Sequence, residues 1–384
     1  MSQNPERPIR IAGAGPSGLA AAISLARAGL PVEVHEARRD VGARFIGDLQ
    51  ILENHSVAER VTDLLQRIGV ETDFYFRPVT WASFYSAGGG KRELRSREPY
   101  GYVVRRGPTE GSLDRGLLGQ ARRLGVQVRF QSRLEPSAAD IVATGPAAPD
   151  GLAREITFES DAPEAIEVFF DHRRSPGGYS YLFILDGVAT FGCAIVADFR
   201  NIDAYFEHAL AAARRIRPID TSRHLRTGYS YMNFHVQDTA TLNGARYVGE
   251  AGGFQDYLFG LGIRYALTTG HLAARSVIEA RDYDALWKAE FPRQAETSLA
   301  NRFLYEGAGN LGLGAFVRLA GLAPDFRTFL AWWHHPTWWR SAIAIVARRR
   351  WRHRGRCAHK PGAHWCRARN TQIQVPPLGP VEDA

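Results

Sequence analysis

The feature that most constrains this chain lies in its first forty residues, where a glycine-rich turn joins a short apolar stretch to a helix. Residues 9–12 predict a buried strand, and the next six residues read GAGPSG. The following segment has helical spacing up to Gly29, and a second predicted strand ends in Glu36. This strand–turn–helix–strand order, with an acid 23 positions after Gly13, is typical of a dinucleotide-binding unit.

Each position of this motif has a physical reason. Gly13 permits the tight turn, Gly15 lets the backbone approach a pyrophosphate, and Gly18 lets helix and strand pack closely. The helix N-terminus presents unpaired N–H groups and a positive dipole to the phosphates. Glu36 can accept hydrogen bonds from ribose hydroxyls, and its charge disfavours a 2′-phosphate. A tight turn alone is the alternative interpretation, but we predict that these three glycines, Ala14 and Glu36 bind a dinucleotide.

A second glycine-rich segment follows much later in the chain. Glu250 ends a predicted strand, and Gly260 and Gly262 precede a long predicted helix. Such a loop can approach the phosphates or the ribityl chain of a ligand while the helix terminus faces the negative group. The two segments together predict one extended cofactor that is held at both ends.

These motifs resemble those of the geranylgeranyl reductase family of flavoproteins, within the wider group that includes aromatic-ring hydroxylases. That family pairs an early G-x-G-x-x-G…E with a late strand–G-D–x-A-x-G…P-x-x-G-x-G–helix motif. Here Glu250 stands where the family usually has Asp, and Tyr257 where it usually has Pro. The resemblance covers roughly residues 8–300 and implies FAD as cofactor, with Glu250, Gly260 and Gly262 among its contacts.

The same resemblance implies one arginine contact, and a departure from the family pattern suggests a second candidate. The segment YVVRRGPTEG is similar to the family's strand–Arg–helix element, which makes Arg106, or else its neighbour Arg105, a candidate FAD contact. Some relatives carry a cysteine in the loop after the acidic strand, whereas this loop has none. Arg44 in that loop is a candidate to reach the cofactor instead, and a solvated loop arginine is the alternative.

The resemblance extends weakly to a substrate-binding segment. Archaeal-type reductases carry Y-x-W-x-F-P followed by G-x-G, and this chain has Tyr179, Tyr181 and Phe183 followed by Gly192-Cys193-Ala194. The three aromatic residues alternate, so they share one face of a strand and are expected to line a hydrophobic substrate cavity. Ordinary sheet packing explains them almost as well.

The predicted fold class is therefore α/β. It consists of a Rossmann-type FAD-binding domain, an inserted antiparallel β-sheet domain for the substrate, and a C-terminal helical segment. The FAD-binding domain is discontinuous and takes residues 1–150 and 240–300. Strand patterns between residues 153 and 197 place the inserted sheet in residues 151–239. Residues 301–356 are the helical segment, and residues 357–384 are expected to be a disordered tail.

The C-terminal segment carries nearly all of the excess charge. From Phe326 onward there are eleven Lys and Arg against two acids, a balance of +9, so the net charge of +8 leaves −1 for the rest. Pro336 predicts the start of a new helix near Thr337. One face of that helix gathers Trp338, Trp339, Ala342, Ile343, Ile345 and Val346. We expect it to bind an anionic membrane surface without spanning it; packing on the protein's own body is the alternative.

Candidates for acid–base chemistry and metal binding are weaker. Asp48, Glu53 and His55 cluster in the loop after the acidic strand and could serve near the isoalloxazine, although polar loop residues are common, so no catalytic residue is singled out. The Cys357–Cys366 cluster does not match zinc spacings, and no metal is expected. Three cysteines, no signal peptide and no apolar stretch long enough to span a bilayer predict a cytoplasmic protein, peripheral on the inner face of the membrane.

The functional prediction is an FAD-dependent oxidoreductase that reduces carbon–carbon double bonds of a hydrophobic, isoprenoid-like substrate. The alternative is a flavin-dependent monooxygenase, because both share the cofactor motifs. A non-catalytic flavin- or nucleic-acid-binding protein is an alternative of another class, and nucleic acid is disfavoured because the basic charge is confined to one segment. The chain has no second G-x-G-x-x-G, so NAD(P)H would dock transiently or another carrier would donate the electrons.

Overall fold

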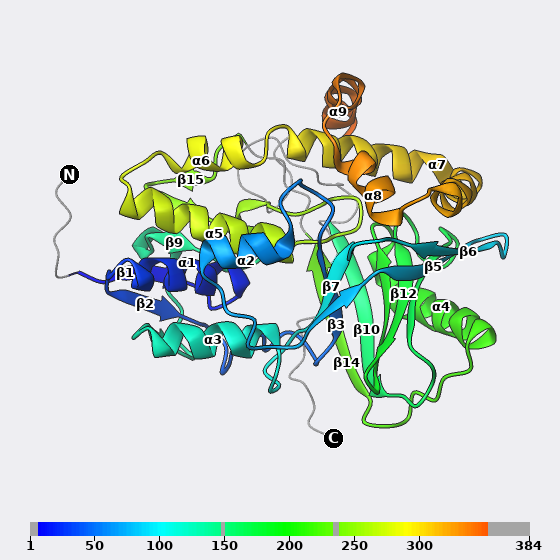
Figure 1. The fold of residues 1–384 in the computed structure, drawn as a ribbon, viewed down its shortest axis with the longest axis horizontal. Coiled ribbons are helices and arrows are strands. Elements are labelled where there is room, and N and C mark those ends of the chain that lie inside the picture. The colour runs from blue at the N-terminus through cyan, green and yellow to red at the C-terminus, as the bar shows by residue number, and fades with distance from the viewer. Residues whose placement is uncertain (1–6, 147–149, 233–237, 352–384) are drawn as a thin grey trace.

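The computed structural model describes residues 7–146, 150–232 and 238–351. One layer is a six-stranded sheet in the order β15-β16-β9-β1-β2-β8, shown on the left of Figure 1. All its pairs are parallel except β15–β16. The strands are β1 (Ile9–Ala12), β2 (Val32–His35), β8 (Gln127–Arg129), β9 (Ile141–Val142), β15 (Thr241–Leu242) and β16 (Ala245–Tyr247). Because β16 pairs with β9, the sheet joins segments that lie before and after residues 151–232 in the sequence.

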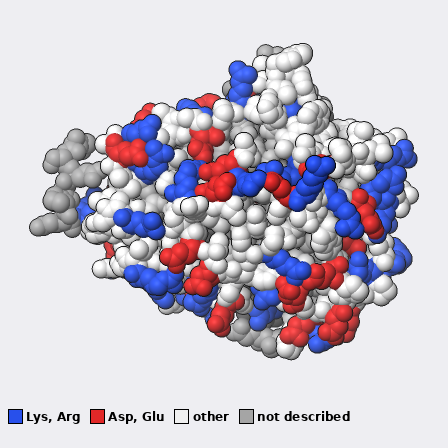
Figure 2. Space-filling view, viewed as in Figure 1, with Lys and Arg blue, Asp and Glu red and all other residues white. Residues whose placement is uncertain are grey.

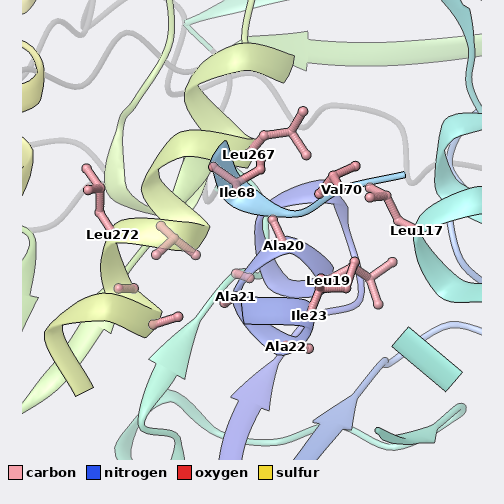
Figure 3. Packing of buried hydrophobic residues seen from close by; sticks show 14 of the residues in the cluster. Leu19, Ala20, Ala21, Ala22, Ile23, Ile68, Val70, Leu117, Leu267 and Leu272 are labelled. Carbon is pink, nitrogen blue, oxygen red and sulfur yellow. The ribbon is translucent and has the colours of Figure 1, made fainter. Parts of the chain in front are cut away.

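Helices cover this sheet and enclose the largest core. They are α1 (Pro16–Arg27), α2 (Val61–Ile68), α3 (Leu113–Arg123), α5 (Ile263–Ile278) and α6 (Tyr283–Glu290). Figure 3 shows Leu19 and Ile23 of α1 packing with Leu117 of α3 and Leu267 of α5, all four fully buried. Helices α1 and α5 lie so close that a Cβ on Gly270 would come within 2.1 Å of the Ser17 carbonyl oxygen. This tight packing holds the N-terminal end of α1 against the middle of α5.

The second sheet has seven strands in the order β14-β10-β13-β12-β11-β5-β6. They are β5 (Trp81–Ser86), β6 (Lys91–Arg95), β10 (Gly151–Glu159), β11 (Ala165–Phe170), β12 (Tyr179–Leu185), β13 (Val188–Ile195) and β14 (Arg226–Met232). Helix α4 (Ile202–Ile216) packs on one face through residues such as Phe206 and Leu210. A small third sheet consists of β3 (Leu49–Glu53), β7 (Gly101–Arg105) and β4 (Phe76–Val79).

Two strands of the seven-stranded sheet lie outside the residue range predicted for the inserted sheet. β5 and β6 precede residue 151, whereas the sheet was assigned to residues 151–239. β5 joins because its Phe84 packs against Phe170 of the neighbouring β11 at a ring distance of 5.0 Å.

The C-terminal helices are α7 (Gln294–Leu322), α8 (Phe326–His334) and α9 (Trp338–Trp351), at the upper right of Figure 1. α7 bends at Gly309, which has φ 57° and ψ −174°. Its residues Leu313 and Val317, with Phe326 of α8, pack into the core beside the second sheet. The helical segment expected at residues 301–356 is therefore partly built into the protein body.

Helix α9 begins directly after Pro336 and Thr337, as expected. Arg340 is fully buried, and its guanidinium lies 4.9 Å from the ring of Trp332 and 4.3 Å from that of Trp339. Trp332 and Trp339 thus pack against a buried side chain of the protein itself. Among the described residues, no helix is both long and apolar enough to cross a membrane. The expected tail at 357–384 and the Cys357–Cys366 cluster lie outside the described residues.

Candidate functional site

A cavity of about 820 Å³ takes lining residues from both large sheets and from α8. At one end it meets the glycine turn and the acid after β2, through Gly13, Gly15 and Glu36. At the other end it is lined by side chains of β12 and α8, including Tyr179 and Leu330. The residues predicted to bind the cofactor and those predicted to bind the substrate therefore line one continuous cavity.

The glycine turn has the geometry that its motif requires. Gly13 has φ +105°, and a Cβ there would come within 2.4 Å of the Ala143 carbonyl oxygen. A Cβ on Gly18 would come within 2.0 Å of the Gly13 carbonyl oxygen, although Gly18 itself does not line the cavity. Gly15 has no neighbouring atom within 4 Å of its Cβ position and caps α1 without a side-chain hydrogen bond. The first N–H groups of α1 can therefore receive an anionic group.

Glu36 holds the turn from the end of β2. Its Oε2 accepts a hydrogen bond from the N–H of Ala14 at 2.9 Å, and its Oε1 accepts one from the N–H of Arg38 at 2.9 Å. Glu36 lines the cavity, whereas Ala14 lies behind it. Because a carboxylate has about four acceptor positions, Glu36 keeps capacity for two hydroxyl donors in the cavity.

A second helix N-terminus reaches the same cavity. Gly262 caps α5 without a side-chain hydrogen bond, and Gly260, which has φ +71°, lines the wall beside it. Arg44 donates from Nη2 to Oε2 of Glu250 at 3.1 Å, and Gln255 donates from Nε2 to Oε1 of Glu250 at 3.2 Å. Arg44 and Glu250 both line the cavity and neutralise one another there.

Arg106 rather than Arg105 lies in the cavity wall. Its Nε and Nη2 donate to the two carboxylate oxygens of Asp114 at 2.9 and 3.0 Å, and Asp114 is fully buried. The guanidinium also lies 4.0 Å from the ring centre of Phe45. Arg105 instead stacks on Tyr75 at 4.7 Å. The bidentate pair holds Arg106 in one orientation at the edge of the cavity.

The other half of the cavity is mostly apolar. Tyr179, Tyr181 and Phe183 project into it from β12. Its remaining apolar lining comprises Leu49, Ile51, Ala82, Phe84, Tyr100, Ile166, Val168, Phe170, Phe259, Phe326 and Leu330. The Tyr179 hydroxyl donates to the Phe259 carbonyl oxygen at 2.5 Å, so it is satisfied within the wall. We call this half the apolar chamber.

Of the three polar loop candidates, only His55 lines the cavity. Asp48 and Glu53 are fully buried behind the wall. Burial raises the pKa of Asp48 and raises that of Glu53 to about 7. Burial and the nearby His334 lower the pKa of His55 to about 3, and its Nδ1 lies 3.0 Å from the Tyr100 carbonyl oxygen. His55 is therefore a neutral wall residue at ordinary pH.

Sequence reasoning missed two contributions to the apolar chamber. Glu155 of β10 brings a carboxyl group into it, and the surrounding sequence REITFES indicates only a strand. Phe326 and Leu330 of α8 wall the chamber on another side. Their helical spacing predicts an apolar face, but the sequence does not say which surface that face covers.

Comparisons with known proteins agree with this architecture. Residues 11–47 match the model of an NAD(P)-binding Rossmann-like domain. A geranylgeranyl bacteriochlorophyll reductase-like protein from Thermoplasma acidophilum is 18% identical, with a TM-score of 0.67 over 88% of this chain and 95% of that one. A flavoprotein/dehydrogenase from Cytophaga hutchinsonii is 15% identical, with a TM-score of 0.62 over 88% of this chain and 97% of that one.

A third solved structure, described as a probable FAD-dependent monooxygenase from Pseudomonas aeruginosa, is 17% identical. Its TM-score is 0.58 over 80% of this chain and 99% of that one. No curated protein sequence matches the chain. These likenesses establish the fold, so the predicted α/β class with a Rossmann-type domain and an inserted sheet is confirmed. Identities this low leave the reaction and the substrate to be argued from the site itself.

Proposed function

We propose that this protein is an FAD-dependent oxidoreductase that reduces a carbon–carbon double bond of a hydrophobic, isoprenoid-like substrate. The observation that carries the proposal is the continuity of one cavity between a dinucleotide cradle and the apolar chamber. Two uncapped helix N-termini, of α1 and α5, meet that cavity and suit a cofactor with two phosphates and a long ribityl chain. FAD, when bound, would supply hydride or electron chemistry at the mouth of the chamber.

The residues present fit this cofactor. Gly13 makes the tight turn, Gly15 leaves room for backbone approach to the pyrophosphate, and Glu36 has acceptors for ribose hydroxyls. The Arg44–Glu250 pair lies where the cradle meets the second helix. A lipid-like substrate suits the chamber because aromatic and aliphatic side chains form most of its wall.

The test uses purified protein reconstituted with FAD and reduced by dithionite without oxygen. Geranylgeraniol and its diphosphate are the probes, and product mass is measured. The expected product has gained two hydrogen atoms per saturated double bond. A protein that fails to take up FAD, or that leaves both probes unchanged, overturns the reductase proposal.

The alternative with support from the fold is a flavin-dependent monooxygenase. Substrate-dependent oxygen consumption with a hydroxylated product would establish it in the same assay. Replacing dithionite by NADH or NADPH tests whether a nicotinamide nucleotide docks transiently as the electron donor. Acidic and basic residues are interspersed on the face shown in Figure 2, a pattern that gives no support to nucleic-acid binding.

We propose in addition that the outer surface of α7–α9 binds the anionic inner face of the cytoplasmic membrane. Seven large apolar side chains are exposed there, namely Leu311, Leu319, Leu322, Trp332, Trp338, Ile345 and Val346. Leu311 is 93% exposed and Trp338 is 81% exposed, which is costly in water and favourable at a lipid interface. In Figure 2 much of the projection at the top of the view is white, with basic side chains at its left edge. Arg318 and Arg348 lie next to these residues in the same helices and suit anionic headgroups.

Vesicle flotation tests this surface without disturbing the cavity. A variant with Leu311→Ser, Leu322→Ser and Trp338→Ser is compared with wild type and with Ile216→Ser, an exposed apolar residue on α4. Wild type and the α4 variant are expected to float with phosphatidylglycerol-containing vesicles, and the triple variant is expected to remain in the soluble fraction. Wild-type protein that does not float at low salt refutes membrane binding.

A further inference from the structure

Glu155 occupies a position in the apolar chamber between two glycines of the neighbouring strands. In the antiparallel register, Glu155 of β10 lies between Gly192 of β13 and Gly228 of β14. Tyr181 of β12 pairs with Gly192 on its other side, so Tyr181, Gly192 and Glu155 form one row across the sheet. A Cβ on Gly192 would come within 2.4 to 2.6 Å of the Tyr181 ring and hydroxyl. The ring therefore lies flat over Gly192 and reaches Glu155.

The Glu155 carboxyl group is held through one of its two oxygens. The Tyr181 hydroxyl donates to Oε1 at 2.9 Å, and the Ser230 hydroxyl donates to the same oxygen at 3.0 Å. Within the described part of the chain no donor contacts Oε2, and Glu155 lines the cavity. It is also the one carboxyl group that the seven-stranded sheet contributes to the lining.

The surroundings allow this carboxyl group to hold a proton at neutral pH. Burial and the charge of Asp48 raise the pKa of Glu155. The hydrogen bonds from Tyr181 and Ser230 and the charge of Arg44 lower it, and the net result is a pKa of about 7. Both protonation states are then populated near neutrality. A group with such a pKa is well matched to proton transfer at that pH.

We propose that Glu155 is the acid that supplies a proton to the substrate in the apolar chamber, and that Tyr181 positions its carboxyl group. This inference rests on the double-bond reduction proposed above. It is carried by the row Tyr181–Gly192–Glu155 and by a side chain that lines the chamber and whose Oε2 receives no hydrogen bond from the described residues. Ser230 assists Tyr181 in fixing Oε1.

The step balances in atoms and electrons. Saturating one double bond requires two electrons and two hydrogen atoms, and the reduced flavin supplies both electrons with one hydrogen as a hydride equivalent. The second hydrogen arrives as a proton from Oε2 of Glu155, where the O–H bond breaks as the C–H bond to the second carbon forms. The resulting carboxylate keeps the hydrogen bonds from Tyr181 and Ser230. Solvent water then returns the proton.

The first test measures the proton directly and needs no substrate. Infrared spectra of FAD-reconstituted protein are recorded across the pH range, and the spectrum of Glu155→Gln is subtracted at each pH. The subtraction is necessary because Glu53 also has a pKa of about 7. The difference is expected to contain the carbonyl band of a protonated carboxyl group that disappears with a midpoint near pH 7. In Tyr181→Phe, which loses one donor to the charged form, the midpoint moves to higher pH.

The second test follows single-turnover saturation of geranylgeraniol by dithionite-reduced protein. The wild-type rate is expected to fall as pH rises through 7, because the acid form is consumed. Glu155→Gln should be slower by about a hundredfold or more and lose that pH dependence, with FAD affinity unchanged. Tyr181→Phe should shift the pH profile of the rate to higher pH, which a purely structural role would not do. Glu159→Gln, on the same strand but outside the cavity, is the matched control.

The outcomes separate this inference from the proposed function. If wild type and Glu155→Gln saturate the probe at equal rates, the role of Glu155 is refuted while the reductase stands. If no band titrates in the difference spectrum, Glu155 does not hold the proton and the inference fails. If wild type saturates no probe although the band titrates near pH 7, the reductase and the transfer to an alkene fail together, and only the proton-holding site is supported.

Discussion

Replacing Glu36 by alanine should weaken FAD binding by an amount that follows from the carboxylate's hydrogen bonds. Two of about four acceptor positions are taken by the N–H groups of Ala14 and Arg38, each at 2.9 Å. The other two can accept ribose hydroxyls, and one hydrogen bond to a charged group contributes about 1.5–3 kcal/mol. Losing one such bond raises the Kd for FAD about tenfold to a hundredfold.

The assay is a fluorescence titration of apoprotein with FAD. Glu36→Gln keeps one acceptor oxygen and should fall between wild type and alanine. Glu33→Gln is the matched control, because Glu33 lies on the same strand and does not line the cavity. Thermal unfolding of each apoprotein checks that the turn still folds without the bond to Ala14. A Kd that changes less than about threefold in Glu36→Ala would show that Glu36 does not bind the ribose.

Four further substitutions test residues in and around the cavity wall. Arg106→Ala leaves the fully buried Asp114 carboxylate unpaired and should lower the free energy of unfolding in urea by about 3–5 kcal/mol. Burial raises the pKa of Glu53 to about 7, whereas the pKa of a glutamate in the unfolded chain is ~4.3. Between these two pH values the folded protein keeps a proton on Glu53 that the unfolded chain has lost. Relative to Glu53→Gln, wild-type stability in urea titrations should therefore fall by about 3 kcal/mol from about pH 4.5 to about pH 7. Gly18→Ala would place a Cβ 2.0 Å from a backbone oxygen, so this variant should have a lower melting temperature and should not bind FAD. Gly15→Ala meets no neighbouring atom within 4 Å, so this variant should fold normally and lose only FAD affinity.

The parts of the site that the sequence predicts are local. The turn from Gly13 to Gly18 and the acid at position 36 are set by neighbouring residues, so strand, turn and helix follow from a short window. The alternation of Tyr179 and Phe183 likewise predicts a shared face, and both residues line the cavity. Arg106 could be proposed only through resemblance, because nothing local separates it from its neighbour in the sequence.

The parts that the sequence does not predict depend on long-range pairing. Glu155 is one polar residue in an alternating strand until the register places it between two glycines from β13 and β14. The parallel pairing of β5 with β11 joins Phe84 to Val168 across more than eighty residues of sequence. Such contacts depend on which strand edges meet in space, and hydrophobic patterns alone do not encode that choice.

The order in which the chain leaves the ribosome has a consequence for its handling in the cell. The glycine turn is among the first segments made, but the sheet that supports it gains β16 only when residue 247 has emerged. The aromatic face of the second sheet is covered later still, when Phe326 and Leu330 of α8 have been synthesised. A nascent chain therefore exposes that aromatic face from the completion of β12 until α8 emerges, which makes chaperone protection most important just before the last helices appear.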